Sequence, residues 1–307
     1  MKKLDGFNLS NVHFKWSPLI KPVLFIDPSE EVEISIPDSS TNQIKENFTT
    51  DDLSKIDQSK FDGAVGPIYI NGAKPGDAIS ITLKKIEIGD WGWSAILSNF
   101  GVLKGRFKDR LIIWKIKNGF AKTKGEFLKD VSIPTRPFLG VIGTAPPNGE
   151  LPMIPPHSSG GNMDNRLLNE GSNIILPVRV DGALLSLSDP HAAQGDGEIC
   201  GTAIETFAKV VIKVDLIKNA NIDLPMAKVN LEDNGSHLLT MGISENPLDA
   251  MKEALLSMIK ELNKRGFSSE EAYVLCSVAG SLKMSEVVDM PNYVVSLTIP
   301  EKIIEKY

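Results

Sequence analysis

The 307-residue sequence predicts a mainly β protein, in which β-sandwich or jelly-roll-like strands and barrel-like strands precede a small α+β C-terminal part. Two observations predict this fold class. Short segments that alternate apolar and polar residues, with Gly, Pro, Asn and Asp between them, dominate residues 20–216. A convincing helical pattern begins only near residue 240. We therefore expect a β-rich body over residues 1–235 and a C-terminal segment, residues 236–307, packed on it.

The alternating segments are typical of strands with one buried face. Clear examples are residues 32–36 (VEISI), 78–83 (AISITL) and 174–178 (IILPV). A proline-led acidic turn precedes each of the first two, and residues 181–188 repeat that arrangement more loosely. This recurrence indicates repeated hairpins rather than a true sequence repeat.

Two helices and one strand are expected in the C-terminal segment. Asn246 is a helix cap, Pro247 suits the first helical position, and Gly266 ends the helix. The apolar residues between them recur at the spacing of one buried helix face: Leu248, Met251, Leu255, Met258, Ile259 and Leu262. Ser268 and Glu271 form a capping-box pattern for a second helix. Residues 294–300 (VVSLTIP) read as the terminal strand.

The composition argues against several classes of protein. The formal net charge is −6, and the scattered basic residues provide no concentrated surface for nucleic acid. No apolar stretch is long enough to span a membrane, and the first residues lack the apolar core of a signal peptide. Only two cysteines occur, Cys200 and Cys276. We therefore expect a cytoplasmic protein with free thiols and no membrane partner.

The densest group of reactive side chains lies in residues 188–198 (SDPHAAQGDGE). The neighbouring segments, 178–188 and 201–216, both read as strands, so we expect a polar loop held between them. His191 is the strongest candidate in this loop because it stands among acids with no large apolar neighbour. Asp196, between two glycines, has the composition of a plain turn residue.

A second polar loop covers residues 155–165 (PPHSSGGNMDN), where two glycines allow close approach to the backbone. His157 and Asp164 flank those glycines. If the two loops meet, Asp164 and His191 could hold a divalent metal together with Asp189, Asp196 or Glu198. Asp164 could instead cap the short turn that follows it.

Two further residues have alternative interpretations. Cys200 could be a nucleophile assisted by His191, although a small buried residue entering the next strand is the simpler reading. Trp93, in the segment DWGWS, could form the apolar wall of a pocket or simply pack in the core.

At these segments the chain resembles the acetamidase/formamidase family. The similar runs are GPIYINGAKPGDAI (66–79), EIGDWGWSAI (87–96), PPHSSGGNMDN (155–165) and LSDPHAAQGDGEICGTAIE (187–205). The resemblance implies a β-rich, oligomeric enzyme that hydrolyses short aliphatic amides to a carboxylic acid and ammonia, with zinc in some relatives. It extends to Asn162, Asp164, Asn165, His191, Gln194, Asp196 and Glu198. Relatives often carry a histidine shortly before the first run, where this chain reads FDGAV (61–65).

These observations predict a metal-dependent amidase that acts on formamide or acetamide and assembles as a homo-oligomer. We expect a divalent metal, zinc above others, to be held by Asp164, His191 and His157. Glu198 is the expected proton acceptor, and Asn162 and His191 complete the catalytic set. Gln194, Asn165 and Trp93 are the expected substrate-binding residues.

Three alternatives stay open at this stage. A cyclic amide or lactam would require the same groups in a roomier pocket. A Cys200-dependent amidase would need no metal. A β-sandwich module could also bind a small carboxylate or sugar without reacting.

Overall fold

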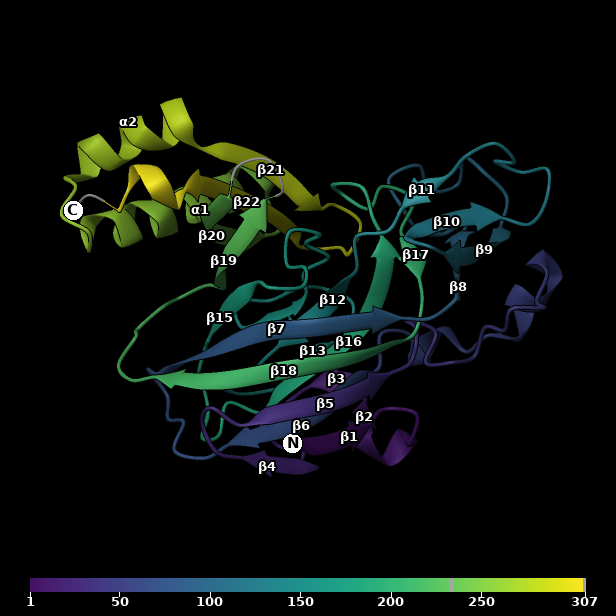
Figure 1. Cartoon of the computed structure of the whole chain (residues 1–307), viewed down its shortest axis with the longest axis horizontal. Coiled ribbons are helices and arrows are strands. Elements are labelled where there is room, and N and C mark those ends of the chain that lie inside the picture. The colour runs from purple at the N-terminus through teal and green to yellow at the C-terminus, as the bar shows by residue number, and fades with distance from the viewer. Residues whose placement is uncertain (232–234, 306–307) are drawn as a thin grey trace.

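The computed structural model describes residues 1–231 and 235–305, and its chain is mainly β (Figure 1). Two large sheets and two C-terminal helices organise these residues. No helix among them is long and apolar enough to cross a membrane.

The first sheet has nine strands within the described ranges, and both of its edges are open. In spatial order they are β1 (Lys2–Asp5), β5 (Glu31–Ile36), β18 (Ala208–Ile217), β7 (Ala78–Ile88), β15 (Asn173–Pro177), β19 (Met226–Leu231), β20 (Gly235–Ser244), β22 (Tyr293–Pro300) and β21 (Ser281–Glu286). The three strands expected at 32–36, 78–83 and 174–178 are therefore confirmed as β5, β7 and β15.

The second sheet is also open. The strands expected to be barrel-like therefore form two stacked sheets rather than a closed barrel. Its main path is β11 (Ile133–Pro134), β10 (Phe120–Thr123), β9 (Arg110–Lys117), β8 (Trp91–Ile96), β17 (Ile204–Glu205), β16 (Leu185–Ala193), β12 (Phe138–Gly143) and β14 (Gly160–Asn162). Strand β6 (Ala64–Ile70) joins this sheet through β16 and pairs with β2 (Val12–His13) and β4 (Leu24–Ile26). A separate pair is formed by β3 (Lys15–Trp16) and β13 (Leu151–Pro152).

The main core lies between the two sheets. Alternate residues of β5, β7 and β18, among them Ile34, Ile81 and Val210, form one buried cluster with Leu139 of β12 and Leu187 of β16. Because strand side chains point to opposite faces in turn, the alternation that predicted the strands also supplies their buried face. The mainly β, sandwich-like fold class is confirmed.

Helices α1 (Pro247–Asn263) and α2 (Ser269–Ala279) form a layer with β20 and β22 (Figure 1). Oδ1 of Asn246 accepts hydrogen bonds from the backbone N–H groups of Leu248 and Asp249, and Ser268 and Glu271 form the expected capping box. Both predicted helices and the terminal strand are confirmed. The division of the chain at residue 235 stays a prediction, and residues 306 and 307 of its second part lie outside the described ranges.

Two strand boundaries near the polar segment differ from expectation. Strand β16 begins only at Leu185 and continues through Asp189 and His191, so the first half of the expected loop is a strand. Backbone pairing with β12, in which Phe138 lies opposite His191, stabilises this extended conformation despite the polar composition. Residues 201–216 contain two strands rather than one, because the chain leaves β17 in the second sheet and enters β18 in the first.

Candidate active site

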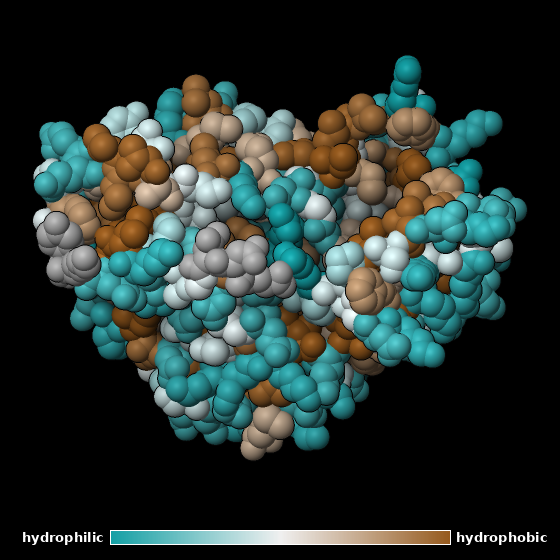
Figure 2. All heavy atoms as spheres, turned by 45° about the horizontal axis from the view of Figure 1, so that its top comes forward, coloured by the Kyte–Doolittle hydropathy of each residue, from teal (hydrophilic) through white to brown (hydrophobic). Residues whose placement is uncertain are grey.

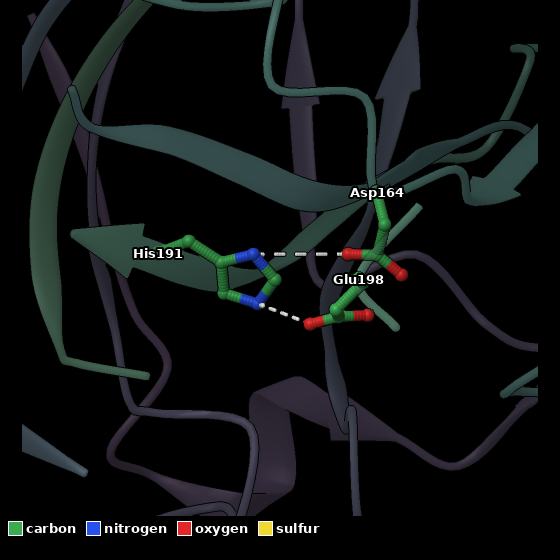
Figure 3. A group of neighbouring side chains, drawn as sticks. All are labelled: Asp164, His191 and Glu198. Carbon is green, nitrogen blue, oxygen red and sulfur yellow. Dashed lines mark ion pairs between the residues drawn. The ribbon is translucent and has the colours of Figure 1, made fainter. Parts of the chain in front are cut away.

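The two predicted polar segments meet. Asp164 follows β14 and His191 lies on β16, and Oδ1 of Asp164 is 3.8 Å from Nδ1 of His191 (Figure 3). The glycines before Asp164 permit this approach: Gly160 has φ +101°, and a Cβ there would lie 2.4 Å from the carbonyl oxygen of Ile142. β14 therefore packs directly on β12 and brings Asp164 beside β16.

Hydrogen bonds fix the orientation of the His191 imidazole. The side-chain amide of Gln194 donates from Nε2 to the backbone carbonyl of Asp164 at 2.6 Å, which directs Oε1 of Gln194 toward Nδ1 of His191 at 2.9 Å. An amide oxygen only accepts, so Nδ1 carries the proton. The other ring nitrogen, Nε2, faces Asp189 Oδ2 and Glu205 Oε2, each at 3.0 Å.

Glu198 approaches the same imidazole from the turn after β16. Its Oε1 lies 4.0 Å from Nε2 of His191, and its backbone has a left-handed φ of +48° (Figure 3). Non-glycine residues rarely adopt this conformation, so the surrounding structure holds Glu198 in place. Its side chain is buried and lies between two cavities, whose linings share Glu198 and Thr202.

The inner of these cavities has a volume of about 100 Å³ and is lined by a polar and an apolar set of residues, which we call its polar side and its apolar side. Asn162 and His191 lie on the polar side with six carboxylates, namely Asp62, Asp164, Asp189, Glu198, Glu205 and Asp289. The apolar side consists of Phe61, Trp93, Leu97, Phe100 and Ile154. No Lys or Arg among the described residues lines the cavity. The site is therefore strongly acidic, and a cation is the partner that its charge favours.

Burial and mutual repulsion shift the ionisation of these groups. Burial, followed by the charge of Asp164, raises the pKa of Glu198 well above its usual value. Burial also raises the pKa values of Asp189, Asp62 and Asp289 strongly. Burial lowers the pKa of His191, but the charges of Asp189 and Glu205 outweigh it and leave that pKa well above its usual value. Perturbed groups gathered around a cavity are typical of functional sites.

The residues present fit a divalent metal ion. Two groups of three side chains bring suitable donor atoms within 4.8 Å of one another: Asp164, His191 and Glu198, and Asp189, His191 and Glu205. Oδ1 of Asp164, Oδ1 of Asp189 and Nε2 of His191 are buried without a hydrogen-bond partner. Imidazole nitrogen and carboxylate oxygen are ordinary ligands of zinc.

Trp93 lies where the sequence suggested. It lines the cavity from β8, is 1% exposed, and packs with its ring centroid 6.3 Å from that of Phe61. It belongs to a small buried cluster as well, so the pocket-wall and core interpretations both describe it.

Three other predicted residues lie outside the cavity lining. Asn165 donates to Oγ of Ser296 and accepts from the N–H of Leu167, so it holds the turn that Asp164 was considered to cap. His157 packs edge-on against Trp16, with ring centroids 5.1 Å apart, and belongs to neither metal-binding group. Gln194 contacts His191 and Asp164 but is absent from the residues that line the inner cavity. Substrate contact by Asn165 and Gln194, and metal ligation by His157, stay predictions without geometric support.

Sequence reasoning missed several carboxylates of the site. Glu205 lies in the buried strand segment AIETFA, where an acid between apolar residues was the available signal. Asp62 lies in the FDGAV segment, which was noted only because relatives often carry a histidine there, and Asp289 belongs to the C-terminal segment, where only helices and a terminal strand were predicted. Asp189 was considered as a ligand but not selected. Asp196, the plain turn residue, forms a bidentate ion pair with Arg166, at 2.6 and 2.9 Å.

Cys200 lies in a different environment. Its side chain is exposed, its thiol donates to the backbone carbonyl of Thr202 at 3.3 Å, and it lines the second cavity rather than the inner one. The simpler reading of Cys200 as a buried residue is wrong, because the turn that contains it lies at the surface.

Together, the sandwich fold and the buried acidic site define a β-rich protein with a centre suited to metal-assisted hydrolysis. The acetamidase/formamidase family model matches residues 7–153 and 149–306, and the chain belongs to this family.

Individual relatives agree with that membership. The chain is 26% identical to a formamidase from Methylophilus methylotrophus, over 96% of this chain and 89% of the relative. It is similar to the crystal structure of a predicted acetamidase/formamidase from Thermoanaerobacter tengcongensis, with 33% identity, a TM-score of 0.90 and coverage of 100% and 97% of the two chains. A gamma lactamase from Delftia acidovorans is less similar in structure, with a TM-score of 0.68, 28% identity and coverage of 97% and 90%.

Proposed function

We propose that this protein hydrolyses a small linear amide to a carboxylate and ammonia with the help of a bound divalent metal. One observation carries the proposal: Nε2 of His191 lies 3.0 Å from both Asp189 Oδ2 and Glu205 Oε2, in the lining of a cavity of about 100 Å³. Membership of the acetamidase/formamidase family supports the choice of substrate.

Asp189, His191 and Glu205 are the residues that we propose hold the metal. Their donor atoms converge more closely than those of Asp164, His191 and Glu198, because the nearest Asp164 oxygen faces the protonated Nδ1. One imidazole with two carboxylates suits zinc. Such an ion, when bound, polarises a carbonyl group and lowers the pKa of a water molecule.

Glu198 is the proposed general base. Its carboxylate borders the cavity, and burial raises its pKa, which makes it a stronger proton acceptor than an exposed carboxylate. We propose that Glu198 accepts a proton from the attacking water and delivers it to the leaving nitrogen. Asp164, which lies near Nδ1 of the same imidazole, adds negative charge that keeps the pKa of Glu198 high (Figure 3).

Asn162 is suited to recognise the substrate amide. Its Nδ2 donates one of its two N–H groups to Oδ2 of Asp289 at 2.8 Å, and the second N–H is available for an oxyanion. Its Oδ1 is buried and without a partner and belongs to a residue that lines the cavity. A free acceptor at this position matches the N–H donors of a primary amide.

Ammonia release and metal content test this proposal together. Purified protein is assayed with formamide and acetamide before and after chelation, and its metal content is measured by elemental analysis. We expect ammonia release that falls with the metal content and returns when zinc is added. Full activity in protein stripped of metal would contradict the metal role. A metal-loaded protein that releases no ammonia from any linear amide would contradict the amidase function.

Hydrolysis of a cyclic amide is a second candidate, supported by the similarity to the Delftia acidovorans gamma lactamase. The lower TM-score makes it the weaker one. Including a γ-lactam in the assay, and comparing its kcat/KM with that of acetamide, separates the two candidates.

We propose that the protein acts in the cytoplasm as a homo-oligomer. Two free cysteines, Cys200 and Cys276, support a reducing compartment. Exposed apolar side chains on α1, α2 and β21, including Tyr273, Val274 and Val278, support self-association through this face. Figure 2 shows hydrophobic atoms gathered over the lobe that contains these elements. Light scattering measures the molecular mass of wild type and of Val278→Glu and so tests self-association through this face. A monomeric wild type would refute the homo-oligomer.

A further inference from the structure

The apolar side of the inner cavity opens into a larger groove. This outer groove has a volume of about 630 Å³ and shares five lining residues with the inner cavity: Gln58, Phe61, Asn99, Phe100 and Ile154. Residues found only in the groove include Phe14, Met153, Pro155, Val288 and Met290. Lys104 is the one charged residue that the described chain contributes to its lining.

The two compartments differ sharply in chemistry. The six carboxylates lie around the inner cavity, whereas no acid within residues 1–231 and 235–305 borders the groove. If the groove admitted only water and a one-carbon amide, aromatic and methionine side chains along its walls would serve no purpose. Walls of this kind stabilise apolar ligand surface by removing it from water.

The polarity of the inner cavity fixes how an amide enters it. The carbonyl and the NH₂ group require the polar side, where Asn162 and His191 lie. The acyl substituent then packs best against Phe61, Phe100 and Ile154, which are the three apolar residues among the five shared with the groove. Formamide has no substituent to place against these residues.

We propose that the preferred substrate is a primary amide with an apolar acyl chain longer than acetyl, whose tail lies in the outer groove. This inference rests on the proposed amidase function and specifies its substrate class. The amide group occupies the inner cavity, and the tail passes between Phe61, Phe100 and Ile154 to reach Phe14 and Met153.

A chain-length series tests the proposal. Metal-loaded enzyme is assayed for ammonia release with formamide, acetamide, propionamide, butyramide and hexanamide. Burial of each added methylene is expected to raise kcat/KM by up to about fourfold. Phe14→Ala removes one groove wall and lowers the ratio of kcat/KM for hexanamide to that for acetamide by about tenfold. Phe120→Ala removes a half-exposed phenylalanine on β10, outside the groove, and leaves this ratio unchanged.

The outcomes separate this inference from the function on which it rests. A kcat/KM that is highest for formamide or acetamide and falls with each methylene overturns the inference and leaves the amidase function intact. Equal ratios for Phe14→Ala and Phe120→Ala also overturn it. Metal-loaded enzyme that releases no ammonia from any member of the series overturns the amidase function itself.

Discussion

Nδ1 of His191 donates a hydrogen bond to Oε1 of Gln194 across 2.9 Å, and this contact decides which ring nitrogen is available to a ligand. The Gln194 amide cannot turn over without losing its hydrogen bond to the backbone carbonyl of Asp164. Nε2, which faces Asp189 and Glu205, is therefore the ring nitrogen that can give up its proton to bind a metal. Partners of this kind orient ligating histidines in many metal sites.

Replacing Gln194 by Leu should lower the affinity for zinc by about 10- to 100-fold, because the imidazole loses its orienting acceptor. Competition with a chromophoric chelator measures the affinity. Ile199→Ala, an exposed position in the same turn, is the control and should change nothing. If Gln194 contacts substrate instead, Gln194→Leu will raise KM while zinc affinity stays at the wild-type value.

Replacing Glu205 by Gln should remove most of the bound metal. The Glu205 carboxylate is held in place by the N–H of Ala203 at 2.7 Å and the hydroxyl of Ser39 at 2.9 Å, so the amide keeps the shape but loses the charge. Elemental analysis gives the metal content. Glu87→Gln, an exposed residue on β7, controls for loss of charge alone. Wild-type metal content in Glu205→Gln would exclude Glu205 as a ligand.

Replacing Cys200 by Ala should leave kcat/KM within about twofold of wild type, because this exposed thiol lines the second cavity rather than the inner one. Ammonia release from acetamide is the measurement. A thiolate nucleophile is essential to its mechanism, so a loss of several orders of magnitude would restore Cys200 as the catalytic group.

Acid should destabilise the fold partly through His157, whose burial lowers its pKa from 6.5 to about 4. The folded state holds this imidazole neutral, so protonation favours the unfolded chain as the pH falls from 6.5 toward 4. These two pKa values correspond to a loss of about 2 kcal/mol in unfolding free energy between pH 7 and pH 5.

Urea unfolding of wild type and His157→Asn at both pH values isolates that contribution, because other groups titrate equally in the two proteins. The pH-dependent loss of stability should be smaller in the variant by this amount. Identical pH dependence in both proteins would show that His157 has the same pKa in the folded and unfolded states.

The sequence predicted elements best where local chemistry determines them. Asn246, Pro247 and the Ser268–Glu271 capping box identified both helices because a helix end is stabilised by its own neighbouring side chains. The β16 strand was mistaken for a loop at Asp189 and His191, because its extended conformation depends on pairing with β12, which is more than forty residues distant in the chain.

The candidate site was predictable only in part for the same reason. His191, Asp164 and Glu198 stand in dense polar segments, and composition alone singled them out. Glu205 and Asp289 are isolated acids among apolar residues, and only the packing of β17 and of the β21–β22 connection brings them to the cavity. Local patterns carry no information on such long-range proximity.

Asp289, which accepts the hydrogen bond from Asn162, makes the cavity depend on both parts of the chain. A truncated variant that lacks the residues beyond 235 would lose Asp289 from the lining of the inner cavity, together with both helices. A rearranged gene would therefore keep a complete cavity only if β21 and β22 were still present with β14. These two strands could be on the same polypeptide or on a second one.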